Sequence, residues 1–396
     1  MSIDIPEGES LSAAQVQTIV GEAIAAIETP EGLTAQEVQS IVAQAMAGQP
    51  EGLTAEQVQA IVDNALAAAE DPDALTGAKV EEIVAMALAD AAMEEERQKG
   101  TITFATLNWS SAEIQSALAQ YIVHHGYGYP VDERPGATIP LFQGLLGGDI
   151  DVTLEIWLPN QNNVWLPALD EGAVIPVGNS LNEQWQSAFV IPTYLADANP
   201  DLRHVDDLKD HMDLFDQEDG KIVLWTCPGS WGCHETNNRQ VAAYGLQDVV
   251  TLKPAEGGGP LFASLQGAYD KNEAWLGYLW APSVPANTLD LTRLEEPEAC
   301  QDNAPEDPDC AYGVGPVRIA VHPSMVQRAP EVIEMLRLWS FTDPQIGEVL
   351  QYRSQTDASA EEAAIWFLTN REAIWTGWVP GDVADRVKAA LAARAS

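Results

Sequence analysis

The chain has 396 residues and carries a formal net charge of −41 at pH 7, with a sequence pI near 4.1. A protein this acidic repels phosphate backbones and anionic lipids, so we expect no nucleic-acid partner and no direct binding to a charged membrane surface. The sequence contains no run of 18 apolar residues, so it predicts no membrane span. It does not start with a basic segment followed by an apolar core, so it predicts no signal peptide.

Residues 1–99 contain a repeat that predicts four short amphipathic helices. The repeats begin at Leu11, Leu33, Leu53 and Leu75 and each reaches an Ile-Val pair further along. In each, the leucine is followed by a Ser or Thr suited to cap a helix, and the apolar residues after it recur at helical spacing. The region holds no His, Cys, Trp or Tyr. We therefore interpret it as a helical repeat extension that acts as a spacer or association module.

From Thr101 onward, strand-like and helix-like segments alternate. The first is a strand at 101–107, followed by a helix that Ser110 or Ser111 would cap. Further strands are expected at 150–157, 188–192, 221–225, 252–254, 274–280 and 317–321, and further helices at 139–146, 236–244, 261–272 and 329–341. This alternation predicts an α/β fold with mostly parallel sheets.

The four cysteines form two close pairs, Cys227 with Cys233 and Cys300 with Cys310. Proline and glycine between the members of the first pair favour a turn, which can bring two Cβ atoms within disulfide reach. An even number of cysteines in local pairs favours two small disulfides and an oxidising compartment. Zinc binding is the alternative, but neither pair has CxxC spacing.

A loop closed by the first pair would present Trp231 on a rigid base. It would also point the backbone N–H groups of Gly232 and Cys233 at one spot. An aromatic face beside free backbone donors suits a small ligand with a methylated cationic head and an anionic tail. The alternative is a purely structural staple with the indole in the core.

Four tryptophans follow or end predicted strands or lie in the cysteine loop: Trp109, Trp157, Trp231 and Trp280. Ligands of open α/β sheets bind beyond the carboxyl ends of strands, so these indoles could converge into a cage for an onium group. Glu155 precedes Trp157 by two residues and shares its side of the strand, where it could attract a cation or accept a hydrogen bond from a protonated head group. Core packing and an ordinary salt bridge are the alternatives.

Residues 295–315 form an acidic, proline-rich loop around the second cysteine pair. Asp302, Asp307 and Asp309 could bind a structural calcium ion, which takes several oxygen ligands, although a solvated loop is the favoured interpretation. We expect no other metal or cofactor. No nucleophile motif, zinc-protease motif or dinucleotide fingerprint is found, so the sequence does not predict an enzyme.

Residues from about 100 to 390 resemble the substrate-binding proteins of glycine betaine/proline-type ABC transporters. The likeness rests on Glu-Ile-Trp-Leu-Pro-Asn around Trp157, Cys-Pro-Gly-Ser-Trp-Gly-Cys at 227–233, Tyr-Leu-Trp-Ala-Pro at 278–282, and the ending from Trp366 to Trp378. It implies a two-lobed periplasmic-binding-protein fold, type II-like. Lobe 1 would comprise residues 100–193 and 316–396, and lobe 2 residues 194–315, all preceded by the extension 1–99.

The resemblance also implies a function: the periplasmic substrate-binding component of an ABC importer. Such a protein holds a small methylated-amine or sulfonium osmolyte between its lobes and reaches the membrane only through the transporter permease. By resemblance, Trp157, Trp231 and Trp280 would enclose the methylated head. Trp109 would add a fourth wall, as its position after the first predicted strand suggests. The N–H groups of Gly232 and Cys233 would meet an anionic oxygen.

The chain departs from the resembled betaine binders at one point. They carry a histidine shortly after the tryptophan that matches Trp157, where this chain has Asn160 and Gln161. With Glu155 in the expected pocket, this favours a head group that donates a proton or is purely cationic. The expected ligand is trimethylamine N-oxide, followed by glycine betaine, choline and dimethylsulfoniopropionate. A ligand-gated sensory or scaffold protein acting through the repeats is the alternative of another class.

Overall fold

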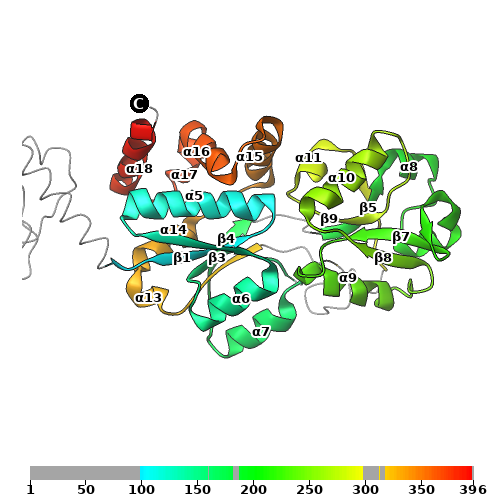
Figure 1. Ribbon diagram of the computed structural model, residues 1–396, viewed down its shortest axis with the longest axis horizontal. Helices are drawn as coiled ribbons and strands as arrows, with labels where there is room; N and C mark the ends of the chain where they lie inside the picture. The colour runs from blue at the N-terminus through cyan, green and yellow to red at the C-terminus, as the bar shows by residue number, and fades with distance from the viewer. Residues whose placement is uncertain (1–98, 159, 182–186, 298–311, 313–316, 395–396) are drawn as a thin grey trace, which may run out of the picture. The chain divides into compact units, whose positions relative to one another are not determined.

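The computed structural model describes residues 99–394 except 159, 182–186, 298–311 and 313–316. The four predicted repeat helices therefore lie outside the described residues. So do the second cysteine pair, Cys300 and Cys310, and the calcium candidates Asp302, Asp307 and Asp309. The described chain forms two α/β lobes, each built on one open sheet (Figure 1).

The first lobe is built on a five-stranded mixed sheet. Its strand order is β2 (Val131–Gly136), β1 (Ile102–Leu107), β3 (Val152–Ile156), β11 (Val317–Val321) and β4 (Ile175–Leu181). β1 pairs in parallel with β2 and β3, whereas β11 pairs antiparallel with β3 and β4. The expectation of mostly parallel sheets is wrong here, because β11 returns from the second lobe and enters the sheet against its neighbours.

Helices cover both faces of this sheet (Figure 1). α5 (Ser110–Tyr127) packs on β1, β2 and β3 from one side, and α6 (Thr138–Gly147) packs on the same strands from the other. The remaining helices of this lobe are α7 (Asn162–Asp170), α13 (Met325–Arg328), α14 (Pro330–Leu338), α15 (Asp343–Thr356), α16 (Ala360–Asn370), α17 (Glu372–Trp375) and α18 (Gly381–Arg394). Each of β1 and β3 is thereby followed by a helix, so their carboxyl ends meet at one edge of the sheet.

The second lobe is built on a six-stranded mixed sheet. Its order is β10 (Leu291–Arg293), β5 (Ser187–Pro192), β9 (Gly277–Trp280), β7 (Lys221–Thr226) and β6 (Gln217–Glu218), and β8 (Val250–Pro254) also pairs with β7. Among its described strands, only β7 with β8 and β7 with β9 are parallel pairs. The sequence predicts that the first part of lobe 1 ends at residue 193, whereas β5 already belongs to the second sheet, where it pairs with β9 and β10.

The described helices of the second lobe are α8 (Thr193–Ala198), α9 (Gly232–Ala243), α10 (Gly258–Tyr269) and α11 (Val284–Thr288), with short 3-10 helices at Val205–Asp210 and Met212–Leu214. α9 begins four residues before the predicted start at Thr236, directly at the cysteine loop. None of the helices in the described part of the chain has the length and apolarity needed to cross a bilayer.

The predicted caps of α5 are wrong. Trp109 occupies the N-cap position, and no side chain caps the helix. Ser110 lies in the first turn, and the Ser111 hydroxyl donates a hydrogen bond to Glu155 at 3.3 Å. The Ser111 hydroxyl therefore bonds to a buried carboxylate and does not cap the backbone of the helix, contrary to what the local pattern predicts.

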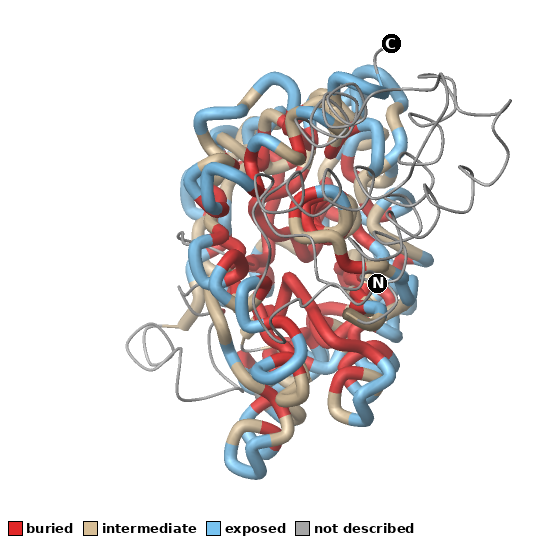
Figure 2. Tube along the Cα trace, turned by 90° about the vertical axis from the view of Figure 1, so that its left-hand side faces the viewer, coloured by how far each residue is buried: buried red, intermediate tan, exposed pale blue. Residues whose placement is uncertain are grey.

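Burial follows the strands and the inner faces of the helices in both lobes (Figure 2). In the first lobe, Trp339 and Trp378 stack with ring centroids 4.4 Å apart, and both are buried. A partly buried ion pair, Asp151 with Arg328 at 2.6 Å, ties the start of β3 to α13. The C-terminal segment thus completes the first lobe's core.

Gly178 of β4 offers a test of how closely sheet and helix approach. A Cβ at this position would lie 2.5 Å from the backbone oxygen of Leu336 in α14. We expect Gly178→Ala to lower the free energy of unfolding by about 1–3 kcal/mol, since strand or helix must shift. Chemical denaturation of the full chain measures this as a lower midpoint at unchanged slope.

Gly267→Ala is the matched control, because a Cβ there meets nothing within 4 Å on α10. It should be neutral or stabilise by roughly 0.5–1 kcal/mol, since alanine favours the helix. Equal midpoints for Gly178→Ala and the unaltered chain would contradict the close packing of β4 on α14.

Candidate functional site

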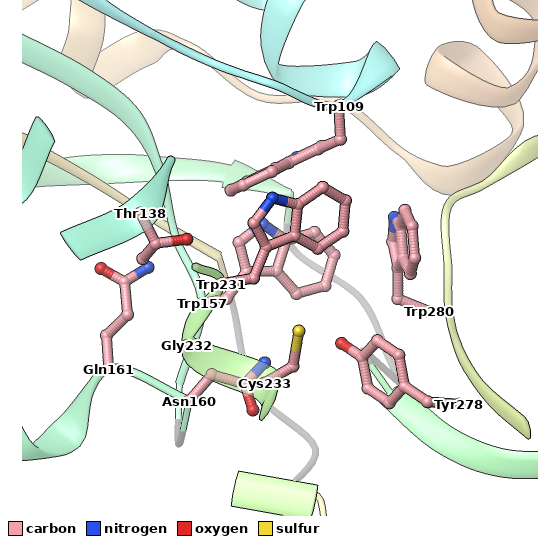
Figure 3. A pocket seen from close by; sticks show the side chains of 10 residues that line it. All are labelled: Trp109, Thr138, Trp157, Asn160, Gln161, Trp231, Gly232, Cys233, Tyr278 and Trp280. Atoms are coloured by element: carbon pink, nitrogen blue, oxygen red, sulfur yellow. The ribbon is translucent and has the colours of Figure 1, made fainter. Parts of the chain in front are cut away.

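One pocket receives five residues from each lobe (Figure 3). Its cavity volume is about 30 Å³, and about 340 Å³ of space lies between its walls when the opening to solvent is counted. The first lobe contributes Trp109, Thr138, Trp157, Asn160 and Gln161, and the second contributes Trp231, Gly232, Cys233, Tyr278 and Trp280. The lining is mainly aromatic, so the pocket suits a ligand with a small apolar body.

The four tryptophans singled out from the sequence all lie around this pocket. Trp109 begins α5, Trp157 follows β3, Trp231 begins α9 and Trp280 ends β9. Each is at most 8% exposed. The Trp231 ring lies 5.1 Å from that of Trp109 and 5.5 Å from that of Trp280, edge to face in both cases. Indoles from both lobes therefore meet at the carboxyl ends of strands.

A disulfide joins Cys227, after β7, to Cys233 in the first turn of α9. Within the loop, the backbone N–H of Trp231 donates to the Pro228 carbonyl at 3.0 Å, so the residue that carries the indole closes a turn. Among the described residues no acceptor takes the N–H of Gly232 or Cys233, because these groups open a helix. The start of α9 thus presents two free donors and a partial positive charge to the pocket.

The lobes approach closely at Gly232. A Cβ on this residue would lie 2.7 Å from the backbone oxygen of Asn160, across the pocket on the first lobe. Beside this approach, the Trp231 indole Nε1 donates to Asn108 Oδ1 at 2.7 Å. The absence of a side chain at Gly232 and this one hydrogen bond let the two halves of the pocket meet.

Glu155 lies behind the pocket and does not line it. Its side chain is fully buried on β3, and Oε2 accepts hydrogen bonds from the Nε1 of Trp109 at 2.6 Å and of Trp157 at 2.8 Å. Ser111 donates to the same oxygen, and Gln115 Nε2 donates to Oε1 at 2.7 Å. The expected direct contact with a head group is therefore replaced by contact with two indoles that do line the pocket.

Burial raises the pKa of the Glu155 carboxyl above its ordinary value, and the four hydrogen bonds pull it back only in part. All four partners are uncharged. The carboxylate is thus held by N–H and O–H donors without a neighbouring cation among the described residues.

Tyr278, Asn160, Thr138 and Gln161 line the pocket but were not predicted as ligand-binding residues. Tyr278 had a signal: it precedes Trp280 by two residues on β9 and so shares its side of the strand. Its hydroxyl bonds with Ser187 Oγ at 3.0 Å and with the Asn160 side chain, and burial raises its pKa to about 12. This hydroxyl therefore stays protonated at neutral pH.

The Asn160 Oδ1 atom is buried and has no hydrogen-bond partner in the structure. A buried polar atom without a partner marks a place where a ligand can complete the hydrogen bonding. Asn160 and Gln161 also had a signal, because they stand where the resembled betaine binders carry a histidine. Nothing in the local pattern indicated Thr138, which begins α6. Within the part of the chain that the structure describes, no three His, Cys, Asp or Glu side chains form a metal-binding group.

Curated proteins similar to this chain cover most of its length. The trimethylamine N-oxide-binding protein of Pelagibacter ubique is 22% identical over 288 residues, which are 70% of this chain and 90% of that protein. The glycine betaine-binding periplasmic protein OusX of Dickeya dadantii is 22% identical over 275 residues, which are 64% of this chain and 81% of that protein.

A solved structure matches the fold. The glycine betaine/L-proline-binding protein of Borrelia burgdorferi superposes with a TM-score of 0.62 at 19% identity, covering 72% of this chain and 99% of that one. At this identity the likeness supports the two-lobed periplasmic-binding-protein fold and nothing finer. A model of the family described as the substrate binding domain of ABC-type glycine betaine transport systems matches residues 100–370, more than half of the chain. This chain therefore belongs to the family of substrate-binding domains of ABC-type glycine betaine transport systems.

Proposed function

We propose that this protein captures a small methylated onium osmolyte in a cage formed by Trp109, Trp157, Trp231 and Trp280 and presents it to an ABC transporter permease. The observation that carries the proposal is the meeting of four indoles, two from each lobe, around one pocket. A methylated onium group has no hydrogen-bond donor of its own, and indole faces attract it through cation–π interaction and apolar contact. A pocket with mainly aromatic walls thus selects such a head group.

The opposite end of the ligand would meet the start of α9. The N–H groups of Gly232 and Cys233 are unsatisfied within the described chain, and the helix N-terminus favours negative charge. An oxygen that carries negative charge, as in an N-oxide or a carboxylate, matches these groups.

Trimethylamine N-oxide remains the first ligand proposed, with glycine betaine close behind. The earlier reason, direct contact of Glu155 with a proton-donating head, loses its support because that carboxylate lies behind the indoles. The order now rests on the small pocket and on the likeness to the Pelagibacter ubique protein. Choline and dimethylsulfoniopropionate share the onium head and are the alternatives of the same type.

The periplasm is the proposed location, and closure of the lobes on the ligand is the proposed signal to the permease. The protein OusX, to which this chain is similar, is periplasmic by name. The disulfide Cys227–Cys233 supports an oxidising compartment. Contact between the lobes through Trp231 and Asn108 links occupancy of the pocket to the distance between the lobes.

Titration calorimetry with trimethylamine N-oxide, glycine betaine, choline and dimethylsulfoniopropionate tests the proposal. We expect at least one to bind with micromolar or tighter affinity. Trp231→Ala should weaken that binding by roughly 10- to 100-fold, because it removes a central face of the cage.

Trp366→Ala is the control. Trp366 stacks on Tyr352 at 4.5 Å and lies outside the pocket, so its loss should leave affinity within about twofold. Absence of binding by all four ligands, or equal losses in both variants, would refute the proposed cage.

A second prediction concerns the approach of the lobes at Gly232. Gly232→Ala keeps the backbone N–H but places a Cβ against the Asn160 oxygen. We expect about tenfold weaker ligand binding, because the lobes cannot approach fully. Gly229→Ala, in the same loop with open space around the added Cβ, is the matched variant and should bind as the unaltered chain does. Calorimetry compares the two, and equal affinities would contradict the role given to this approach.

A further inference from the structure

The strongest feature that the proposed cage does not use is the charge on Glu155. Its Oε2 accepts hydrogen bonds from two of the four indole N–H groups, that of Trp109 at 2.6 Å and that of Trp157 at 2.8 Å. The other oxygen accepts from Gln115, whose own Oε1 accepts from the Trp339 indole at 2.9 Å. The carboxylate is therefore fixed by contacts that run from the cage into the core of the first lobe.

In the described part of the chain, no positive group balances this carboxylate. The groups that face it are Trp109 from the connection before α5, Ser111 and Gln115 from α5, and Trp157 from the end of β3. All are uncharged, and within the described chain no lysine, arginine or histidine pairs with it. Isolating a carboxylate from water without a counter-ion is costly, even when donors surround it. An apolar or amide side chain would avoid that cost, so the charge itself needs an explanation.

We propose that Glu155 is a positioning and specificity-determining residue, which holds the Trp109 and Trp157 indoles by their N–H groups and whose negative charge behind them makes the pocket prefer ligands with a positive head. This inference deepens the proposed function and rests on it. An osmolyte's onium group then serves as the counter-ion that Glu155 does not find among the described residues.

Two physical effects produce the preference. A carboxylate that accepts from an indole N–H pushes electron density toward the ring, and charge-assisted hydrogen bonds strengthen in a water-poor setting. Cation–π attraction to the opposite part of the ring grows accordingly. The carboxylate also attracts the onium group directly, because an interior of low polarity screens the charge weakly.

A merely structural role would look different in one measurement. If Glu155 only fixes the indole planes, its loss weakens binding of any ligand of the right shape. If its charge matters, its loss weakens binding of the positive ligand and spares an uncharged ligand of equal shape. Choline and glycine betaine each have a tert-butyl analogue, in which carbon replaces nitrogen and one positive charge is removed.

The experiment measures the affinity of each onium ligand and of its tert-butyl analogue, the latter by displacement of bound onium ligand, for the full chain and for Glu155→Gln. We expect the unaltered protein to favour the onium member by at least about tenfold, and Glu155→Gln to reduce that preference by about tenfold. The affinity for the analogue should change by no more than about twofold. Equal losses for both members, or an unchanged preference, would overturn the proposal.

The double variant Glu155→Gln with Gln115→Glu tests whether the lost preference comes from the lost charge or from a disturbed structure. The amide at 155 can still accept from the two indoles and donate to the new carboxylate at 115, which also accepts from Trp339. The negative charge then lies on residue 115, one hydrogen bond further from the cage. We expect part of the lost preference to return. A double variant that binds the analogue normally and regains no preference would show that charge is not the cause.

Glu113→Gln is the control for net charge. Glu113 lies on α5 and pairs with Arg353 at 2.6 Å, away from the pocket lining. Its loss should leave the preference unchanged, and a loss equal to that of Glu155→Gln would overturn the proposal. If no onium ligand binds the unaltered protein, the proposed function fails before this inference is reached, so the two failures are distinguishable.

A pH series provides an independent readout. Choline has a permanent charge, and none of the four groups facing Glu155 titrates near neutral pH. Because burial raises the pKa of Glu155, the carboxyl takes up a proton as the pH falls toward that pKa, and its negative charge is lost. Choline affinity should therefore fall on acidification in the unaltered protein and stay level in Glu155→Gln. Parallel pH curves for the two proteins would contradict the proposal.

Discussion

The hydrogen bonds from two indoles to the Glu155 carboxylate are the constraint on which the first half of the site depends. They orient Trp109 at the start of α5 and Trp157 after β3, and they bind strand to helix through Ser111 and Gln115. A hydrogen bond to a charged acceptor is stronger and more directional than apolar packing, which alone would leave a flat ring free to turn. The same contacts leave a buried charge with no cation beside it among the described residues, a cost that positioning the indoles alone would not require.

The half of the site on the second lobe depends on a disulfide and a helix start. The disulfide Cys227–Cys233 and the start of α9 fix Trp231 and two backbone donors on the second lobe. These groups reach the first lobe only because Gly232 has no side chain facing Asn160. Neither lobe alone supplies both an aromatic enclosure and free donors. This division of the pocket between the lobes agrees with the chain's membership of the family of substrate-binding domains of ABC-type glycine betaine transport systems. A ligand held by both lobes favours their approach.

Local signals in the sequence located most of the elements, because strand ends, turns and helix periodicity are encoded by neighbouring residues. The placement of Trp109, Trp157 and Trp280 at strand ends followed from such signals, and the same alternation would have identified Tyr278. The depth of Glu155 could not be predicted, because it depends on Gln115 and Ser111, which are distant in sequence. The antiparallel entry of β11 likewise depends on how the chain returns between lobes. The repeats at 1–99 remain a sequence-based expectation.

A crystal structure of the protein with the tightest-binding of the four osmolytes tests the central claim most directly. The account predicts methyl carbons against the faces of Trp109, Trp157, Trp231 and Trp280, with the ligand's oxygen within hydrogen-bonding distance of the Gly232 or Cys233 N–H. It also predicts that Glu155 keeps its contacts with both indoles and does not touch the ligand. A ligand bound elsewhere, or a head group in direct contact with the Glu155 carboxylate, would contradict it.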